Sequence, residues 1–299
     1  MTRRAESVTV RFTPPTANID GSLPIALDRI DIFAMTLAPD ARPPFAAELR
    51  IPANRIASIP ATGAPAAATT FVEAVPASAR TRYYQVVPYA NRSRQGTASA
   101  LISVPLDAAS TAPEKGAIAY DEQTLTLTWP AMEGATYLVY NSTDSTDAPN
   151  APLQAERLKT AKFTQPVVFG KRVCFVVRAV AGTAPVSIES PPSAEVCETP
   201  VDTFPPPAPT GLIALASPGA ISLTWDPVTA ADLAGYIVLR GEGSSDRLQP
   251  LMTEPVTGTS FNDQTVKAGV RYFYAVVAVD KATPANRSKS SNVVDETGR

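Results

Sequence analysis

The fold is decided by two stretches near the C-terminus, ISLTW at Ile221–Trp225 and RYFYAVVAV at Arg271–Val279. Both are rich in β-branched and aromatic residues and alternate between two faces, which is the pattern of β-strands. A third strand with a turn-forming entry, DLAGYIVLR at Asp232–Arg240, lies between them in the sequence. These stretches predict an all-β domain whose inward side chains are Ile221, Leu223 and Trp225 in the first strand, and Tyr272, Tyr274, Val276 and Ala278 in the second.

The same strands recur twice more in this chain of 299 residues. LTLTW at Leu125–Trp129 repeats the tryptophan strand, and VTVRF at Val8–Phe12 repeats it with Phe12 in place of the tryptophan. The longer strand recurs as RYYQVVPY at Arg82–Tyr89 and as RVCFVVRA at Arg172–Ala179. The spacing is about a hundred residues, the size of one seven-stranded sandwich. We therefore expect three domains, at residues 1–107, 108–200 and 201–299.

The third domain resembles a fibronectin type III domain of the bacterial kind, with DLAGY before its third strand and AVDKATPANRSKSSN after its sixth. The resemblance implies a core tryptophan and a tyrosine corner, here Trp225 and Tyr272. The repeats make Phe12, Trp129 and Tyr83 the other core aromatics. The expected fold class is all-β, with three tandem immunoglobulin-like (fibronectin type III) β-sandwiches. The proline-rich second linker, residues 199–209, favours an extended conformation and predicts an elongated arrangement.

The first domain departs from this template at its start and in its middle. Only eleven residues precede Phe12, so its first strand is missing or truncated. One explanation is that the sequence as given starts too late. The other is that the domain lacks this strand and exposes an edge for pairing. We favour the first, because an open sheet edge promotes aggregation. The second departure is a long connection rich in Ala and Pro, Leu37–Ala79. An insertion of this kind is a suitable place for an interaction surface.

The composition excludes most catalytic chemistry. The chain contains no histidine, which removes Ser–His and Cys–His nucleophiles and every zinc site that needs histidine. Asp144 and Asp147 lie in an oxygen-rich stretch, yet their spacing does not match a calcium loop. We therefore expect no catalytic residue, no metal site and no cofactor. The formal net charge of −2 provides no field for nucleic acid, and no apolar run reaches the roughly 18 residues of a membrane span.

Two cysteines, Cys174 and Cys197, fall in the sixth strand and the expected seventh strand of the middle domain. A hairpin between these strands would place them opposite each other, with Cys174 on the outer face. A cross-strand disulfide would stabilise the domain by roughly 3–3.5 kcal/mol and implies an oxidising compartment. The alternative, two unrelated thiols, is disfavoured because both lie in paired strands. The disulfide would also compensate for Val173, which stands at the tyrosine-corner position.

Four arginines flank the sixth strand of the first domain: Arg80, Arg82, Arg92 and Arg94. One interpretation is a patch for an acidic protein partner, because guanidinium pairs well with carboxylates. The alternative, solvated charge at the ends of a strand, is favoured. Nucleic acid is disfavoured because no aromatic residues interleave with the arginines. A sugar-binding face is a weak alternative that requires exposed aromatics, for which the candidates are Tyr84, Tyr89, Tyr140 and Phe273.

Together these observations predict a non-catalytic cell-envelope protein that acts as a spacer and presents β-sandwich loops and edges to a protein partner, within a larger envelope assembly. We expect it to be exported to the periplasm or the cell surface. Bacterial proteins that resemble it often carry a lipoprotein signal, so a lipid anchor upstream of residue 1 is part of this expectation. The alternative function is that of an accessory carbohydrate-binding module.

Overall fold

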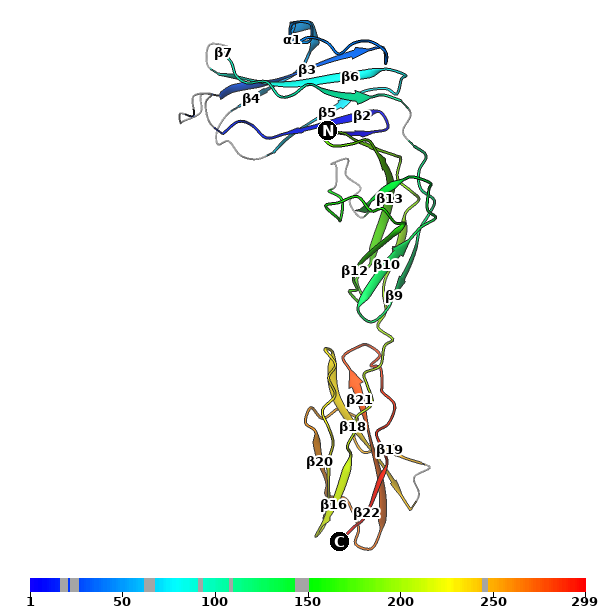
Figure 1. Ribbon diagram of the computed structural model, residues 1–299. Helices are drawn as coiled ribbons and strands as arrows, with labels where there is room; N and C mark the ends of the chain where they lie inside the picture. Colours follow the sequence, from blue (N-terminus) through cyan, green and yellow to red (C-terminus); the bar gives the residue numbers. More distant parts are fainter. Residues whose placement is uncertain are drawn as a thin grey trace. The chain divides into compact units, whose positions relative to one another are not determined.

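The computed structural model (Figure 1) describes residues 1–16, 21, 27–61, 68–90, 94–107, 110–142, 151–243 and 247–299. Within these residues the regular structure is strand, apart from the four-residue helix α1 (Ala46–Leu49) and the 3-10 turn η1 (Pro52–Asn54). The predicted all-β fold of sandwiches is thus confirmed. In this part of the chain no helix is long and apolar enough to span a membrane. Asp144, Asp147 and Arg92 lie outside the described residues.

The chain forms two compact units. The first comprises Met1–Val167 and Arg172–Glu198, and the second comprises Val168–Lys171 and Thr199–Arg299. The first unit contains two separate hydrophobic cores, each between the sheets of one sandwich, whereas the second unit contains one. The described residues therefore form three sandwiches, two in the first unit and one in the second.

The first sandwich packs two antiparallel sheets around the alternating residues Val8, Val10, Ile30 and Ile32. This alternation places apolar β-branched side chains on one face of each strand, which is why the two sheets bury them against each other. One sheet contains β1 (Thr2–Arg4), β2 (Ser7–Phe12) and β5 (Thr69–Ala74). The other contains β4 (Arg55–Pro60), β3 (Leu27–Leu37), β6 (Thr81–Ala90), β7 (Arg94–Gln95) and β8 (Ile102–Pro105).

The middle sandwich buries Trp129 between its sheets, with the ring 5.2 Å from that of Tyr137 in an edge-on contact. The backbone N–H of Met132 donates to the Tyr137 hydroxyl at 2.6 Å, so this buried polar group is satisfied. One sheet contains β12 (Lys162–Pro166), β10 (Thr124–Thr128) and β9 (Ala117–Tyr120). The other contains β11 (Thr136–Asn141), β13 (Val173–Ala181), β14 (Ser187–Glu189) and β15 (Val196–Glu198).

The third sandwich repeats this arrangement in the second unit. Trp225 lies 5.4 Å from Tyr236, again edge-on, and the Val228 N–H donates to the Tyr236 hydroxyl at 2.8 Å. Tyr272 forms a tyrosine corner, because its hydroxyl accepts the backbone N–H of Lys267 at 2.9 Å. One sheet contains β16 (Ile213–Ser217), β17 (Ala220–Thr224) and β20 (Ser260–Asp263). The other contains β19 (Gln249–Pro250), β18 (Leu233–Glu242), β21 (Arg271–Asp280) and β22 (Val294–Thr297).

Strand β1 joins the first two sandwiches into one sheet. It pairs antiparallel with β2 of its own sandwich and parallel with β14 of the middle sandwich. The first strand is therefore short but present, and its outer edge is occupied by β14. The edge of the first sandwich at β1 is thus paired within the chain.

The predicted core aromatics differ in their positions. Trp129, Trp225 and Tyr272 are buried in their sandwich cores, whereas Phe12 is half-buried at the margin of the first core. Tyr83 requires a correction: it is buried on the opposite face of β6, and Tyr84 occupies the sandwich core. The physical reason is that β6 has apolar side chains on both faces, so alternation alone does not identify the inner one.

Candidate functional site

The Phe45 loop, which we define as residues 42–51, covers the outer face of the sheet formed by β3 and β6 (Figure 1). It belongs to the long connection between β3 and β4. Leu49, the last residue of α1, is fully buried there and packs with Phe33 of β3 and Val87 of β6. This small second core attaches the loop to the sandwich.

Polar contacts hold the end of the loop and the segment that follows it. Arg50 donates from Nε to Oε1 of Gln85 at 2.8 Å, and Gln85 donates from Nε2 to the carbonyl of Ser99 at 2.8 Å. Gln85 is buried, so these two bonds satisfy an amide that would otherwise destabilise the fold. The side-chain amide of Asn54 donates to the carbonyl of Glu48 at 3.0 Å. The loop therefore has a defined conformation.

The carboxylate of Glu48 caps the first turn of α1. Its Oε2 accepts the backbone N–H of Phe45 at 2.8 Å and Nη1 of Arg42 at 2.9 Å. The hydrogen bond from Arg42, followed by that from the Phe45 N–H, lowers the pKa of Glu48 to about 2. The cap is therefore ionised at neutral pH, which favours both hydrogen bonds.

Phe45 itself points into solvent, with 64% of its surface exposed, and Ile51 at the other end of the loop is 43% exposed. The Arg42 guanidinium lies 4.3 Å from the centre of the Phe45 ring and covers one side of it. An apolar ring that is exposed and already ordered loses little entropy when a partner covers it. The connection is predictable from its Ala- and Pro-rich sequence, whereas the role of Phe45 is not. The available signal was Glu48 three residues after it, the spacing of a capping box.

The three predicted arginines that the structure describes, Arg80, Arg82 and Arg94, do not form one patch. Arg82 donates from Nε to Glu73 at 2.9 Å and from Nη1 to the Thr36 hydroxyl at 2.7 Å, so its charge is used inside the sandwich. Arg80 is exposed and directly precedes β6, whereas Arg94 is exposed on β7 and pairs with Ala90 at the opposite end of β6, on the order of 30 Å away along the strand. This separation disfavours a surface shared by Arg80, Arg82 and Arg94, and the exposure of Arg80 and Arg94 agrees with the favoured interpretation of solvated charge at the ends of the strand.

The aromatic residues considered for sugar binding are not a row of exposed rings. Tyr84 and Tyr140 are buried. Tyr89 and Phe273 are half-buried and lie beneath the guanidinium groups of Arg29 and Arg271. Since sugar platforms need accessible ring faces, these four positions do not provide one.

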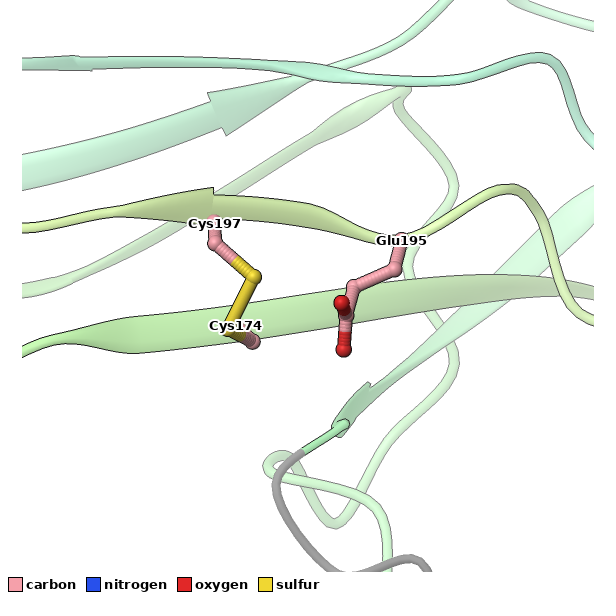
Figure 2. A group of neighbouring side chains, drawn as sticks. All are labelled: Cys174, Glu195 and Cys197. Carbon is pink, nitrogen blue, oxygen red and sulfur yellow. A yellow bond between two sulfur atoms is a disulfide. The ribbon is translucent and has the colours of Figure 1, made fainter.

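The predicted disulfide between Cys174 and Cys197 is present and links β13 to β15 (Figure 2). The Ser142 N–H donates to the carbonyl of Cys174 at 2.9 Å, so the backbone of Cys174 bonds toward β11. Cys174 and Cys197 therefore form a non-hydrogen-bonded cross-strand pair, the closer of the two antiparallel types, and their Cα atoms are 4.0 Å apart. Cys174 lies on the face opposite Phe175 and is nevertheless buried.

A cluster of three carboxylates lies in the second unit. Oxygen atoms of Asp202, Asp232 and Asp280 lie within 4.8 Å of one another. Asp280 is buried, and its oxygens accept the Ala282 N–H at 3.1 Å and the Asn286 N–H and side-chain amide at 2.7 Å each. Asp280 thus fixes the turn between Ala282 and Asn286.

Arg3 fixes the junction between the first two sandwiches. Its side chain is buried, and its guanidinium donates to three successive backbone carbonyls, those of Pro105, Leu106 and Asp107, at the end of β8. The adjacent Arg4 donates to Glu189 of β14 at 2.8 Å. Charged side chains on both faces of β1 therefore hold this strand between the sandwiches.

A cavity of about 330 Å³ lies beside this junction. It is bounded by Leu101–Ser103 and Pro105 of the first sandwich and by residues 182–186 and Ile188 of the middle sandwich. None of these lining residues has a side chain that acts as a general acid or base, and the hydroxyls of Ser103 and Thr183 therefore have no activating base among them.

No family model matches the chain. Solved structures similar to it include a Fn3-like protein from Clostridium thermocellum, with 26% identity over 32% of this chain and 96% of that chain, and a TM-score of 0.28. They also include chicken CNTN1 FN1–FN3 domains, with 14% identity over 99% of this chain and 95% of that chain, and a TM-score of 0.31. The assignment of a fibronectin type III-type fold rests on the strand order of the sheets and not on the TM-scores.

Proposed function

We propose that this protein is a non-catalytic, exported interaction and spacer protein of the cell envelope, and that it binds a protein partner through the Phe45 loop. The sandwiches act as the scaffold, and the loop supplies the contact. The observation that carries the proposal is that Phe45 is exposed while its backbone, its neighbour Arg42 and the buried Leu49 hold it in place.

Binding physics supports this assignment. Interface hot spots are enriched in aromatic and arginine side chains that enter a pocket on the partner, and pre-organised anchors bind with a smaller entropic cost. Phe45 and Arg42 provide both residue types in one stacked arrangement. The carbohydrate-binding alternative has less support, since the aromatics considered for it are buried or lie beneath arginines.

Export is supported by the disulfide, because such bonds persist in oxidising compartments. Within the proposal, the native protein resides in the periplasm or at the cell surface and is held there by a lipid anchor. Cell fractionation with maleimide labelling before and after reduction tests the location. Partitioning of the native protein into detergent tests the anchor. Labelled thiols without reduction would contradict export.

The binding proposal is tested in native cells with a photo-crosslinking amino acid at position 45, and with the same amino acid at position 72 as the matched control. Val72 is an exposed residue on β5 of the same sandwich, outside the Phe45 loop. We expect a discrete cross-linked protein at position 45 and none at position 72. Once that protein is purified, Phe45→Ala should weaken its binding about thirtyfold, the effect of a hot spot of about 2 kcal/mol.

Glu48→Ala provides a second measurement, because it leaves the ring in place and removes the cap that orders it. We expect weaker binding than for the unmodified protein, but stronger than for Phe45→Ala. Equal cross-linking at positions 45 and 72, or unchanged affinity of Phe45→Ala, would rule out the loop as the binding site.

A further inference from the structure

Strand β16 of the third sandwich has an open edge. It is the terminal strand in the sheet order β16-β17-β20. The Trp225 N–H donates to the Thr259 carbonyl on the β20 side, so Ser222 and Thr224 bond toward β16, where their partners are Leu215 and Ile213. The alternate residues of β16, Ala214 and Ala216, therefore direct their N–H and C=O groups outward. Within the described residues no hydrogen bond reaches these outward groups, whereas the preceding outward residue is bonded by Asn292.

The side chains along this edge are unusually apolar for a surface. Ile213 is 63% exposed and Leu215 is 69% exposed, and they are neighbours on the outer face of the same strand. Strand β9 of the middle sandwich has the equivalent place, and its register puts Ala117 and Ala119 where the third sandwich has Ile213 and Leu215. The large side chains are therefore not a requirement of the sandwich.

The usual protection of edge strands is missing at β16. Natural edges carry charges, prolines or bulges that prevent pairing with another chain. Charged residues stand in several other terminal strands, namely Arg55 in β4, Glu73 in β5, Lys162 in β12 and Asp295 in β22, whereas the equivalent strand β9 carries none but has small alanines at its outward positions. No charged residue occurs anywhere from Pro209 to Trp225. The outward residues of β17 and β20 that continue this face are small and uncharged: Ser222, Thr224, Ser260 and Asn262.

We propose that β16 pairs with β16 of a second copy of this chain and forms a reversible antiparallel dimer. The strand is self-complementary. Around a two-fold axis at Leu215, Ala214 of one copy faces Ala216 of the other, and these two pairs form four backbone hydrogen bonds. Leu215 then meets Leu215 of the second copy in a close, non-hydrogen-bonded pair. Since neither edge carries charge, two identical surfaces meet without repulsion.

The size of the contact determines its strength. Two five-residue strands bury less than the roughly 1,200 Å² typical of stable interfaces, so the dimer is weak, with a Kd above about 10 μM. Such a contact is populated where copies of the chain are concentrated. A permanent dimer would require a larger interface.

Sedimentation equilibrium of the full chain, from about 10 μM to 1 mM, tests the proposal. We expect the average mass to rise with concentration from 31.5 kDa toward that of a dimer. Leu215→Lys should weaken association at least tenfold, because it places like charges opposite each other. Ala119→Lys is the matched control at the equivalent position of β9 and should leave association unchanged. Both positions are exposed, and circular dichroism verifies folding.

The register has its own test. A Leu215→Cys variant should form a disulfide-linked dimer under mild oxidation, because the facing Cα atoms lie within disulfide range, whereas Ala119→Cys should not. A wild-type chain that stays monomeric up to about 1 mM would overturn the proposal. Association that Leu215→Lys does not weaken would place the contact elsewhere and overturn it as well.

Discussion

The middle and third sandwiches secure the same pair of strands in different ways. In the middle sandwich Cys174 of β13 faces Cys197 of β15, and a disulfide joins them. At the equivalent register of the third sandwich, Phe273 of β21 faces Asp295 of β22, and Arg271 forms an exposed ion pair with that aspartate at 2.7 Å. One position thus carries a covalent link in one copy and a weak surface contact in the other.

The tyrosine corner accounts for part of this difference. Tyr272 bonds the Lys267 N–H, whereas its counterpart in the middle sandwich is Val173, which has no hydroxyl. The middle sandwich therefore has a covalent link to the next strand at the start of the strand whose corner bond is missing. In the third sandwich the start of the equivalent strand is held by the corner bond to the preceding connection and by the ion pair with β22, so the two copies hold this strand by different bonds.

Buried carboxylates show a second contrast. Asp263 of β20 accepts Arg240 and the Tyr274 hydroxyl at 2.8 Å each, and so links the two sheets of the third sandwich. The register puts Gln165 at this position of the middle sandwich. The middle sandwich has its buried carboxylate at Glu189 instead, which bonds Arg4 of the first sandwich and the Tyr140 hydroxyl. Asp263 thus links the two sheets of its own sandwich, whereas Glu189 binds an arginine of the neighbouring sandwich.

The largest expected effect comes from removing the carboxylate that links the sheets. Asp263→Ala should lower the free energy of unfolding of the third sandwich by about 3–5 kcal/mol, because it leaves Arg240 without its buried partner. Gln165→Ala, at the equivalent position of the middle sandwich, should change stability by less than about 1 kcal/mol. Calorimetry of the full chain gives both values. Similar losses for the two variants would refute the contrast.

Removal of the disulfide is next in size. Replacing Cys174 and Cys197 together by serine should destabilise the middle sandwich by about 3 kcal/mol, since the bond closes a loop with a sequence separation of 23. The transition of the third sandwich serves as the internal control, because that sandwich contains no cysteine. Urea unfolding with and without reductant measures the effect. A middle sandwich as stable without the bond would mean that another contact ties β15.

The corner bond should have a smaller effect. Tyr272→Phe retains the buried ring and removes only the hydroxyl, which leaves the Lys267 N–H without its acceptor. We expect a loss of about 1–2 kcal/mol from the third sandwich in urea unfolding. Val173→Leu, a conservative change at the equivalent position of the middle sandwich, should cost less. If Tyr272→Phe is neutral, the corner bond does not stabilise the start of β21.

Much of this contrast could be predicted from the sequence. The alternation in ISLTW and RYFYAVVAV and the repeats placed Trp129, Trp225 and Tyr272, because a strand with one buried face follows a period of two. The disulfide was predictable because both cysteines fell in strands that a hairpin would pair. The same rule failed at Tyr83, because the Phe45 loop gives β6 a second buried face.

Other features depend on tertiary contacts that no local pattern reveals. The burial of Arg3 has no local sequence signal, because it requires the carbonyls at the end of β8, about a hundred residues away. Three serines could have been found, since each follows a sixth strand. Ser99, Ser193 and Ser291 each accept a backbone N–H of that strand at 3.0 Å. Because serine is common in turns, a serine after the sixth strand does not stand out from other turn serines in the sequence.

The smallest expected effect is the loss of stability of the third sandwich in acid, which tests the contribution of the Asp263 carboxylate directly. Burial acts to raise its pKa, but hydrogen bonds from the hydroxyl and N–H of Thr265, and then those from Arg240 and Tyr274, outweigh burial and lower it. A carboxyl whose pKa is lower in the folded state contributes stability above its unfolded pKa, about 3.9, and loses it as pH falls through the folded value. Below about pH 4 the third sandwich should therefore lose up to about 1.4 kcal/mol per pH unit through this residue.

Asp263→Asn isolates this contribution, because the amide cannot titrate. Urea midpoints of the third sandwich between pH 5 and 2 should depend less on pH in the variant than in the unmodified protein. The middle sandwich has Gln165 at this position, so its acid response should be the same in both proteins. An equal slope in the variant would assign the acid sensitivity to other carboxylates. The sheets of the third sandwich would then be linked by apolar packing, as in the middle sandwich, and the contrast between the two would reduce to the disulfide and the corner.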